Sequence, residues 1–240
     1  MDNKLDNESF KFSDLIDDYL RRKAYPARIG TYWPSEIGNC IRWNYYKRFI
    51  EKETPSDKLR MFKSADLTHG FIRDVLASSN KVRLLAWEKP FSIIVDDFEI
   101  SGRLDDVIVV KIADRVEPIV VEVKSVSGKS IDHVTAPKMD HVYQIHPYLK
   151  ATRHEGHAAS VAVLWYLARD TYADKFFTVF YDQRVMDEAI ARIRTLHNHL
   201  TVHTLPSVET SGRSRSWRCW FCPYWRECRD DVNLDPIEKE

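Results

Sequence analysis

The chain has 240 residues, 44% of them hydrophobic, which is enough to bury the core of one large domain with a small appendage. Its 36 basic residues balance its 36 acidic residues, which excludes a global electrostatic attraction to nucleic acid or to a membrane surface. The sequence contains no run of about 18 apolar residues and no signal-peptide pattern, so we expect a cytoplasmic protein without membrane contact.

The first two predicted helices cover residues 9–23 and the stretch from Ser35 to about Phe49. The second helix carries Cys40 and a cluster, residues 42–48, in which aromatic and basic side chains are interleaved. Such a cluster suits single-stranded nucleic acid, because bases stack on rings while cations contact phosphates. The alternative is that the rings belong to the core and the charges are solvated. The sequence leaves both interpretations open.

A third helix is predicted from about Leu59 to Leu76. His69 lies on its apolar face together with Ala65 and Ile72, so the imidazole is expected to point inward. A single inward histidine is more often a satisfied core residue than a ligand. Its role therefore depends on the residues that it meets.

Strand-like segments separated by turn signals follow this helix. They cover residues 81–87, 91–95, 98–110 and 118–125. Turns are expected at residues 96–97 and 113–114. Because the last two segments follow each other as a hairpin, Asp105 can lie close to Glu122, while its neighbour Asp106 is expected to face away.

The segment 118–125 is apolar and rich in β-branched residues, which is typical of a strand buried on both faces. It nevertheless contains Glu122 and Lys124, which point to the same side because side chains alternate along a strand. Unpaired charges in a core are costly, so the strand end either pairs them internally or opens into a polar cleft. Taken alone, the Glu-x-Lys tripeptide favours an ordinary ion pair.

The functional interpretation adds Asp105 to this pair. Two carboxylates that converge on one point repel each other unless a cation lies between them, and hard oxygen ligands select magnesium or manganese. Such a metal acidifies a bound water, and a neighbouring Lys124 can orient that water and stabilise negative charge. This arrangement suits hydrolysis of a phosphodiester.

The second half of the chain begins with a helical pattern at residues 139–153, in which Gln144 and Tyr148 share a face and Pro147 interrupts the backbone hydrogen bonding. Two further strands and a long amphipathic helix are predicted after it. They cover residues 161–168, 176–181 and 183–203.

Three cysteines lie close together after a basic segment at residues 211–218, in the pattern Cys219-x2-Cys222-x5-Cys228. In a reducing compartment this spacing favours a shared metal centre over disulfides, and the distant Cys40 is available as a fourth ligand. Such a centre would clamp the C-terminal segment to an N-terminal helix. An iron-sulfur cluster and a four-thiolate zinc site both fit the spacing, and a redox cysteine set is a poorer third interpretation.

Taken in order, these motifs resemble the RecB-like PD-(D/E)xK nucleases with an iron-sulfur cluster, and most closely the CRISPR-associated protein four family of small exonucleases. The motifs that carry the resemblance are Cys40, His69, Gly102-x2-Asp105, Glu122-x-Lys124, Gln144-x3-Tyr148 and Cys219-x2-Cys222-x5-Cys228. Each motif is weak alone, and the strength of the resemblance lies in their ordered combination over roughly residues 35–228.

The resemblance implies an α/β restriction-endonuclease-like fold, a mixed sheet flanked by helices, with an iron-sulfur-stapled appendage. It implies a helical segment at 1–56, a nuclease core at 57–205 and a cysteine cluster with a tail at 206–240. The implied magnesium or manganese ligands are His69, Asp105, Glu122 and the backbone carbonyl of Val123. Lys124 would position the attacking water, while Gln144 and Tyr148 would line the site and contact DNA. The implied ligands of a chiefly structural 4Fe-4S cluster are Cys40, Cys219, Cys222 and Cys228.

The function implied by the resemblance is a metal-dependent exonuclease that cuts single-stranded DNA from an end, commonly the 5′ end. Trimming of spacer precursors in CRISPR adaptation would be its role, with CRISPR integrase proteins as partners. A repair or viral recombination nuclease with the same machinery is the first alternative. The second is a DNA-binding or assembly subunit that cleaves slowly or not at all, although the full set of Asp105, Glu122 and Lys124 argues against it.

Overall fold

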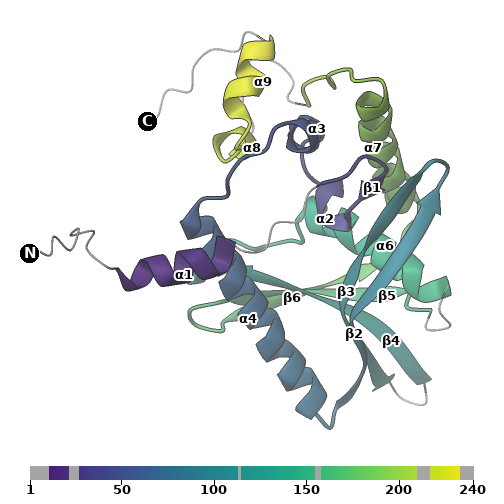
Figure 1. Cartoon of the computed structure of the whole chain (residues 1–240). Helices are drawn as coiled ribbons and strands as arrows, with labels where there is room; N and C mark the ends of the chain where they lie inside the picture. The colour runs from purple at the N-terminus through teal and green to yellow at the C-terminus, as the bar shows by residue number, and fades with distance from the viewer. Residues whose placement is uncertain (1–10, 22–26, 113–114, 155–157, 210–216, 233–240) are drawn as a thin grey trace, which may run out of the picture.

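A mixed β-sheet forms the centre of the molecule in the computed structural model, which describes residues 11–21, 27–112, 115–154, 158–209 and 217–232 (Figure 1). The strands in this part of the chain are β1 (Thr31–Tyr32), β2 (Val82–Val95), β3 (Phe98–Ile112), β4 (Arg115–Val126), β5 (Val161–Ala168) and β6 (Asp174–Phe180). Their order is β1-β3-β4-β5-β6, with β2 paired to β3. The predicted α/β fold with a mixed sheet is therefore confirmed.

Strands β2, β3 and β4 form an antiparallel meander, whereas β5 runs parallel to β4. The predicted turn between β2 and β3 is present, and Asp96 has a φ of +51°, a left-handed conformation that Asp adopts more readily than most residues. The predicted turn at 113–114 lies outside the described residues. The parallel β4–β5 pair needs a crossover connection, which α6 (Met139–His154) provides.

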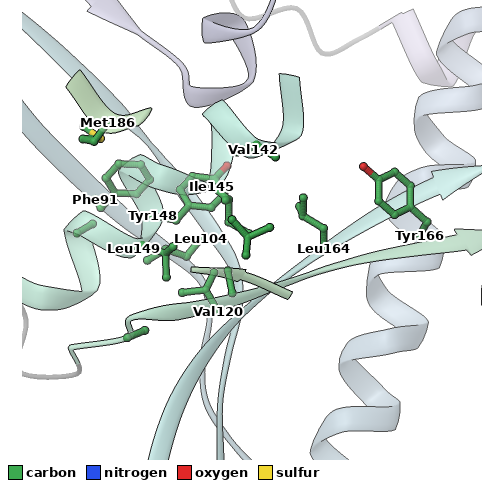
Figure 2. Close-up of a cluster of buried hydrophobic side chains, with 14 of the residues drawn as sticks. Phe91, Leu104, Val120, Val142, Ile145, Tyr148, Leu149, Leu164, Tyr166 and Met186 are labelled. Atoms are coloured by element: carbon green, nitrogen blue, oxygen red, sulfur yellow. The ribbon is translucent and has the colours of Figure 1, made fainter. Parts of the chain in front are cut away.

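Helices cover both faces of the sheet. Helix α4 (Ser56–Ser78) packs Ile72 and Leu76 against Val121 and Val123 of β4. The opposite face of the sheet lies against α6 and α7 (Gln183–Thr201), and Figure 2 shows side chains of α6 beside those of β3, β4 and β5. Strand β4 is therefore buried on both faces, as its sequence predicts. A charged side chain on β4 is consequently surrounded by protein and not by solvent.

The predicted single helix from Ser35 to Phe49 is wrong. The structure has two helices, α2 (Pro34–Ile37) and α3 (Ile41–Phe49), separated at Gly38. A Cβ atom at Gly38 would lie 2.4 Å from the Cα atom of Asp140 in α6, so only glycine permits this close approach. The break is therefore caused by a tertiary contact that local propensity does not report.

The predicted separation of 81–87 from 91–95 is also wrong, because β2 is one continuous strand. Its pairing with β3 shifts register between Leu84 and Ala86, and Glu88 has a φ of +42°. An irregular strand of this kind interrupts the alternation of side chains, so sequence reading divides it in two.

The segment 31–37 joins the sheet and core although the sequence groups it with an N-terminal helical segment. Strand β1 pairs with β3, and Tyr32 and Ile37 pack against α7. The division of the chain at 56/57 and 205/206 stays a prediction. The remaining helices of the described part are α1 (Phe12–Arg21), α5 (Gly128–Ile131), α8 (Trp217–Trp220) and α9 (Trp225–Val232). Within the described ranges, no helix combines the length and apolar character needed to cross a bilayer.

Candidate active site

Two carboxylates, Asp105 and Glu122, meet where β3 and β4 pair. The two strands are in antiparallel register, with Asp106 opposite Val121, and the same register carried one residue further puts Asp105 opposite Glu122. The Val123 N–H donates to Asp105 Oδ2 over 3.3 Å, which attaches the aspartate to β4. The predicted proximity of Asp105 and Glu122 is present in the structure.

Glu122 is buried at the centre of a hydrogen-bond network. Its Oε1 accepts from Lys124 Nζ at 2.5 Å and from Gln144 Nε2 at 2.8 Å. Lys124 Nζ also donates to Gln144 Oε1 at 2.7 Å, so the amide of Gln144 bridges the acid and the ammonium. The second oxygen, Glu122 Oε2, is buried and has no hydrogen-bond partner among the described residues.

The electrostatic state of the two acids differs. Burial and, after it, the negative charge of Asp105 raise the pKa of Glu122 to about 7, against the opposing charge of Lys124. Burial also favours the neutral form of Asp105, but the hydrogen bond and charge of His69 outweigh it and lower the pKa of Asp105. Two buried carboxylates thus lie side by side, and a cation bound between them would offset both their burial and their mutual repulsion.

His69 reaches the acids from the other side of the sheet. Its Nδ1 lies 3.3 Å from Asp105 Oδ2, and its side chain is 29% exposed. Burial alone would lower the pKa of His69, but the hydrogen bond to Asp105 and its charge raise it above the usual value. The predicted inward histidine therefore meets an acidic side chain instead of an apolar core.

Arg73, one helical turn after His69, is a site neighbour that the sequence reading did not identify. Its Nε lies 3.6 Å from Asp106 Oδ1. Burial and, after it, the charge of Asp105 raise the pKa of Asp106 to about 6, against the opposing charge of Arg73. Asp106 therefore turns toward α4, and the i, i+4 spacing of His69 and Arg73 was the signal that could have indicated the pair.

Tyr148 completes the α6 side of the site. Its hydroxyl accepts a hydrogen bond from Gln144 Nε2 at 3.1 Å, and its ring packs edge-on against Phe91. Burial raises the pKa of Tyr148 well above its ordinary value, so the phenol stays protonated. Pro147 lies inside α6, yet Gln144 and Tyr148 keep the shared face that the sequence predicts.

The four cysteines come from two parts of the chain that lie near each other, the start of α3 and the C-terminal segment with α8 and α9. Cys40 precedes α3, Cys219 is in α8, Cys222 lies between α8 and α9, and Cys228 is in α9. Burial and, after it, the neighbouring Cys40, Cys228 and Cys219 raise the pKa of the Cys222 thiol to about 11. All four are free thiols. Four thiols are the donor type of a thiolate-bound metal or cluster, although as the side chains stand the described residues bring no three of them close enough to hold a metal ion.

Protein contacts also hold the C-terminal segment to α3. The rings of Tyr46 and Tyr224 stack with centroids 5.9 Å apart, and the Tyr224 hydroxyl donates to the Ile50 carbonyl at 3.2 Å. Lys52 Nζ donates to the Pro223 carbonyl at 2.6 Å. The basic residues 211–216 and the acidic residues 233–240 lie outside the described part of the chain.

The cluster at residues 42–48 faces largely inward. Arg42 donates to the Pro206 carbonyl at 2.6 Å, and Arg48 Nη2 lies 2.8 Å from the buried Glu36 carboxylate. Tyr46 is buried. These contacts favour the structural interpretation of the cluster over the nucleic-acid one.

As the side chains stand, the described residues contain no group of three or more His, Cys, Asp or Glu positioned to hold a metal ion. At the acidic site the reason is visible, because Lys124 and His69 occupy carboxylate oxygens. A cation would bind there through the unpaired Glu122 Oε2 and through Asp105 once these contacts yield. The donor chemistry fits Mg²⁺ or Mn²⁺.

Known families and solved structures resemble this chain to different degrees. A family model described as the PD-(D/E)XK nuclease superfamily matches residues 35–229. The fold is similar to the crystal structure of SSO0001, with a TM-score of 0.58 and 17% identity over 93% of this chain and 98% of that chain. An alkaline exonuclease, LHK-Exo from Laribacter hongkongensis, has a TM-score of 0.49 and 11% identity over 73% of this chain and 92% of that chain. The comparison with curated proteins gave no match.

Proposed function

This chain belongs to the PD-(D/E)XK nuclease superfamily, and from that premise we propose that it is a divalent-metal-dependent exonuclease acting on single-stranded DNA. The observation that carries the proposal is the buried Glu122 carboxylate, which shares one oxygen with Lys124 and Gln144 and leaves the other unpaired beside Asp105. A protein that only bound DNA would have little need for this arrangement, because an unpaired buried carboxylate oxygen is destabilising.

Asp105 and Glu122 would hold a magnesium or manganese ion, with His69 and the Val123 carbonyl as further ligands. When bound, such an ion supplies positive charge to the scissile phosphate and acidifies the attacking water. Lys124 would orient that water and stabilise the negative charge that develops on the phosphate. Gln144 holds the side chains of Lys124 and Glu122 in place. The Tyr148 hydroxyl, one turn further along α6, accepts a hydrogen bond from the Gln144 amide and so fixes its orientation.

We propose that Cys40, Cys219, Cys222 and Cys228 hold a 4Fe-4S cluster with a structural role. The raised pKa of Cys40 and Cys222, caused first by burial, keeps these thiols protonated without a metal, and metal binding would displace the protons. The cluster would stabilise the same junction between α3 and the C-terminal segment that Tyr46 and Tyr224 already form.

The substrate end and the cellular role are the finer parts of the proposal. We propose cutting from the 5′ end and trimming of spacer precursors in CRISPR adaptation together with integrase proteins. Their support is the ordered set of motifs from Cys40 to Cys228 and the superfamily match. A repair or recombination nuclease would use the same site chemistry, and neighbouring integrase genes would separate the two roles.

The proposal is tested with three substrates of one sequence: a 5′-labelled strand, a 3′-labelled strand and a circular strand, each with Mn²⁺. We expect early release of label from the 5′-labelled strand, gradual shortening of the 3′-labelled strand and no cutting of the circle. Cutting of the circle would show an endonuclease, and binding without any cutting would favour the DNA-binding alternative.

A further inference from the structure

His141 lies beside the proposed nuclease site on the first turn of α6. It precedes Gln144 by three residues and Tyr148 by seven, so the three side chains form one stripe along the helix. Below this stripe, Lys124 of β4 is the register partner of Tyr166 of β5. The imidazole of His141 lies over this pair, with its ring centroid 5.5 Å from that of Tyr166.

The hydroxyl of Tyr166 determines which nitrogen of His141 carries the proton. Tyr166 is fully buried, and its oxygen accepts the backbone N–H of Lys138 at 3.1 Å. The hydroxyl hydrogen then points to His141 Nδ1, which lies 2.8 Å away and is its only acceptor among the described residues. Nδ1 is therefore the acceptor, and the proton of the neutral ring is on Nε2.

The imidazole is kept neutral as well as oriented. Burial and, after it, the ammonium groups of Lys124 and Lys138 lower the pKa of His141 to about 3. These two lysines and the Tyr166 hydroxyl are the titratable groups of β4, β5 and the turn before α6 that face the ring. His141 as a whole is half-buried, and its Nε2–H makes no hydrogen bond to any described residue.

We propose that His141 is a DNA-positioning residue whose Nε2–H donates a hydrogen bond to a non-bridging phosphate oxygen of the strand in the nuclease site. The inference rests on the proposed function. A phosphate oxygen fits because it only accepts hydrogen bonds, and because Lys124 and Lys138 make the surroundings of the ring cationic. On this face of α6, Gln144 and Tyr148 orient the carboxylate of Glu122, whereas His141 contacts the DNA strand.

Two substitutions separate this role from a structural one. In His141→Gln the side-chain amide reaches the position of Nε2, whereas in His141→Asn it reaches only the position of Nδ1. A phosphate contact needs a donor at the Nε2 position, but the bond to Tyr166 needs a partner at the Nδ1 position. If His141 contacts phosphate, His141→Asn loses DNA affinity and His141→Gln keeps it. If His141 serves only to bond Tyr166, His141→Gln is the variant that loses its contact.

Affinity for a single-stranded oligonucleotide is measured with Ca²⁺ in place of Mn²⁺, over a range of salt concentrations, with thermal unfolding of each variant as the folding control. We expect His141→Asn to weaken binding roughly tenfold with an unchanged unfolding temperature, and His141→Gln to bind within about threefold of wild type. The slope of log Kd against log salt should stay unchanged in both variants, because the lost donor is neutral.

The proposal is overturned if His141→Asn binds as wild type does, or if His141→Gln loses as much affinity as His141→Asn. A salt slope lowered by about one in His141→Asn would show a cationic contact and would also contradict it. If wild type binds the oligonucleotide but does not cleave it with Mn²⁺, the proposed function fails while this contact stands. If wild type binds no DNA, both proposals fall together.

Discussion

Gln144 donates a hydrogen bond from its amide nitrogen to Glu122 over 2.8 Å, and this bond joins α6 to the buried charge on β4. The same amide accepts from Lys124 at 2.7 Å, so one side chain holds both members of the Glu-x-Lys motif. Because Glu122 Oε1 is then fully used, Glu122 Oε2 is left available next to Asp105. An ion pair that served stability alone would not need this third partner.

Replacing Gln144 by Leu should lower the cleavage rate about 10- to 100-fold, because Lys124 and Glu122 lose the group that holds them in register. The unfolding free energy should fall by roughly 1–3 kcal/mol, since the buried Tyr148 hydroxyl and Glu122 Oε1 lose a donor. Cleavage kinetics and thermal unfolding check both effects. A Gln144→Leu enzyme with wild-type kcat would show that the bridge has no part in the reaction.

Divalent metal should stabilise the wild-type protein. At a concentration 100-fold above Kd, binding adds about 2.7 kcal/mol, which for a chain of this size raises Tm by roughly 5–10 °C. Asp105→Asn and Glu122→Gln should show little or no increase with Mn²⁺, because each removes an anionic ligand. Thermal unfolding with EDTA and with added Mn²⁺ measures this. Equal increases in wild type and both variants would mean that the ion binds elsewhere.

Glu122 should contribute a loss of stability to the metal-free protein as pH rises from about 5 to 8. The pKa of Glu122 is about 7 in the folded protein against an ordinary value of 4.5, so the folded state binds the proton more tightly. This contribution is complete below the ordinary pKa and is lost as pH rises through the folded one, a difference of at most roughly 3 kcal/mol. His69, with its raised pKa, acts in the same direction.

Glu122→Gln is the matched control for this pH dependence, because it keeps the shape of the side chain and removes its titration. Asp105, whose pKa is lowered, is ionised in both states across this window and leaves the slope unchanged. Urea unfolding at pH 5, 6, 7 and 8 with EDTA should show a flatter profile for the variant. A variant profile as steep as that of wild type would assign the slope to other groups.

Much of this site could be predicted from sequence, because local patterns determine it. Strand alternation places Glu122 and Lys124 on one side, and helical spacing places Gln144 and Tyr148 on one face. That the Gln144 face of α6 covers the Glu122 side of β4 was predicted only from the order of the motifs along the chain. Neither the strand pattern nor the helix pattern indicates which strand a helix covers.

Features that depend on tertiary contacts were missed. Strand β1 has two residues, too few for any periodicity, and the break at Gly38 exists because α6 passes close to it. His141 lies on the stripe of Gln144 and Tyr148, but its tautomer depends on Tyr166, 25 residues away. Arg42 and Arg48 are basic residues that turn inward, and only their buried acceptors reveal why.

The cysteine set predicts a brown protein when purified without oxygen, with absorbance near about 400 nm from thiolate-to-iron charge transfer. Cys222→Ser should lose this absorbance and lower Tm, because the junction between α3 and the C-terminal segment loses its clamp. Iron and sulfide analysis together with the visible spectrum measure the outcome. A colourless anaerobic preparation that contains one zinc per chain would contradict the cluster.

In the proposed mechanism, Lys124 orients the attacking water at a metal site formed by Asp105 and Glu122. This mechanism is tested most directly by cleavage of end-labelled single-stranded DNA with Mn²⁺, comparing wild type with Lys124→Ala, and by DNA binding with Ca²⁺. We expect a loss of at least about 10²- to 10³-fold in cleavage rate, while DNA affinity changes by less than about tenfold. Cleavage by Lys124→Ala at the wild-type rate, or wild-type cleavage that persists in EDTA, would contradict it.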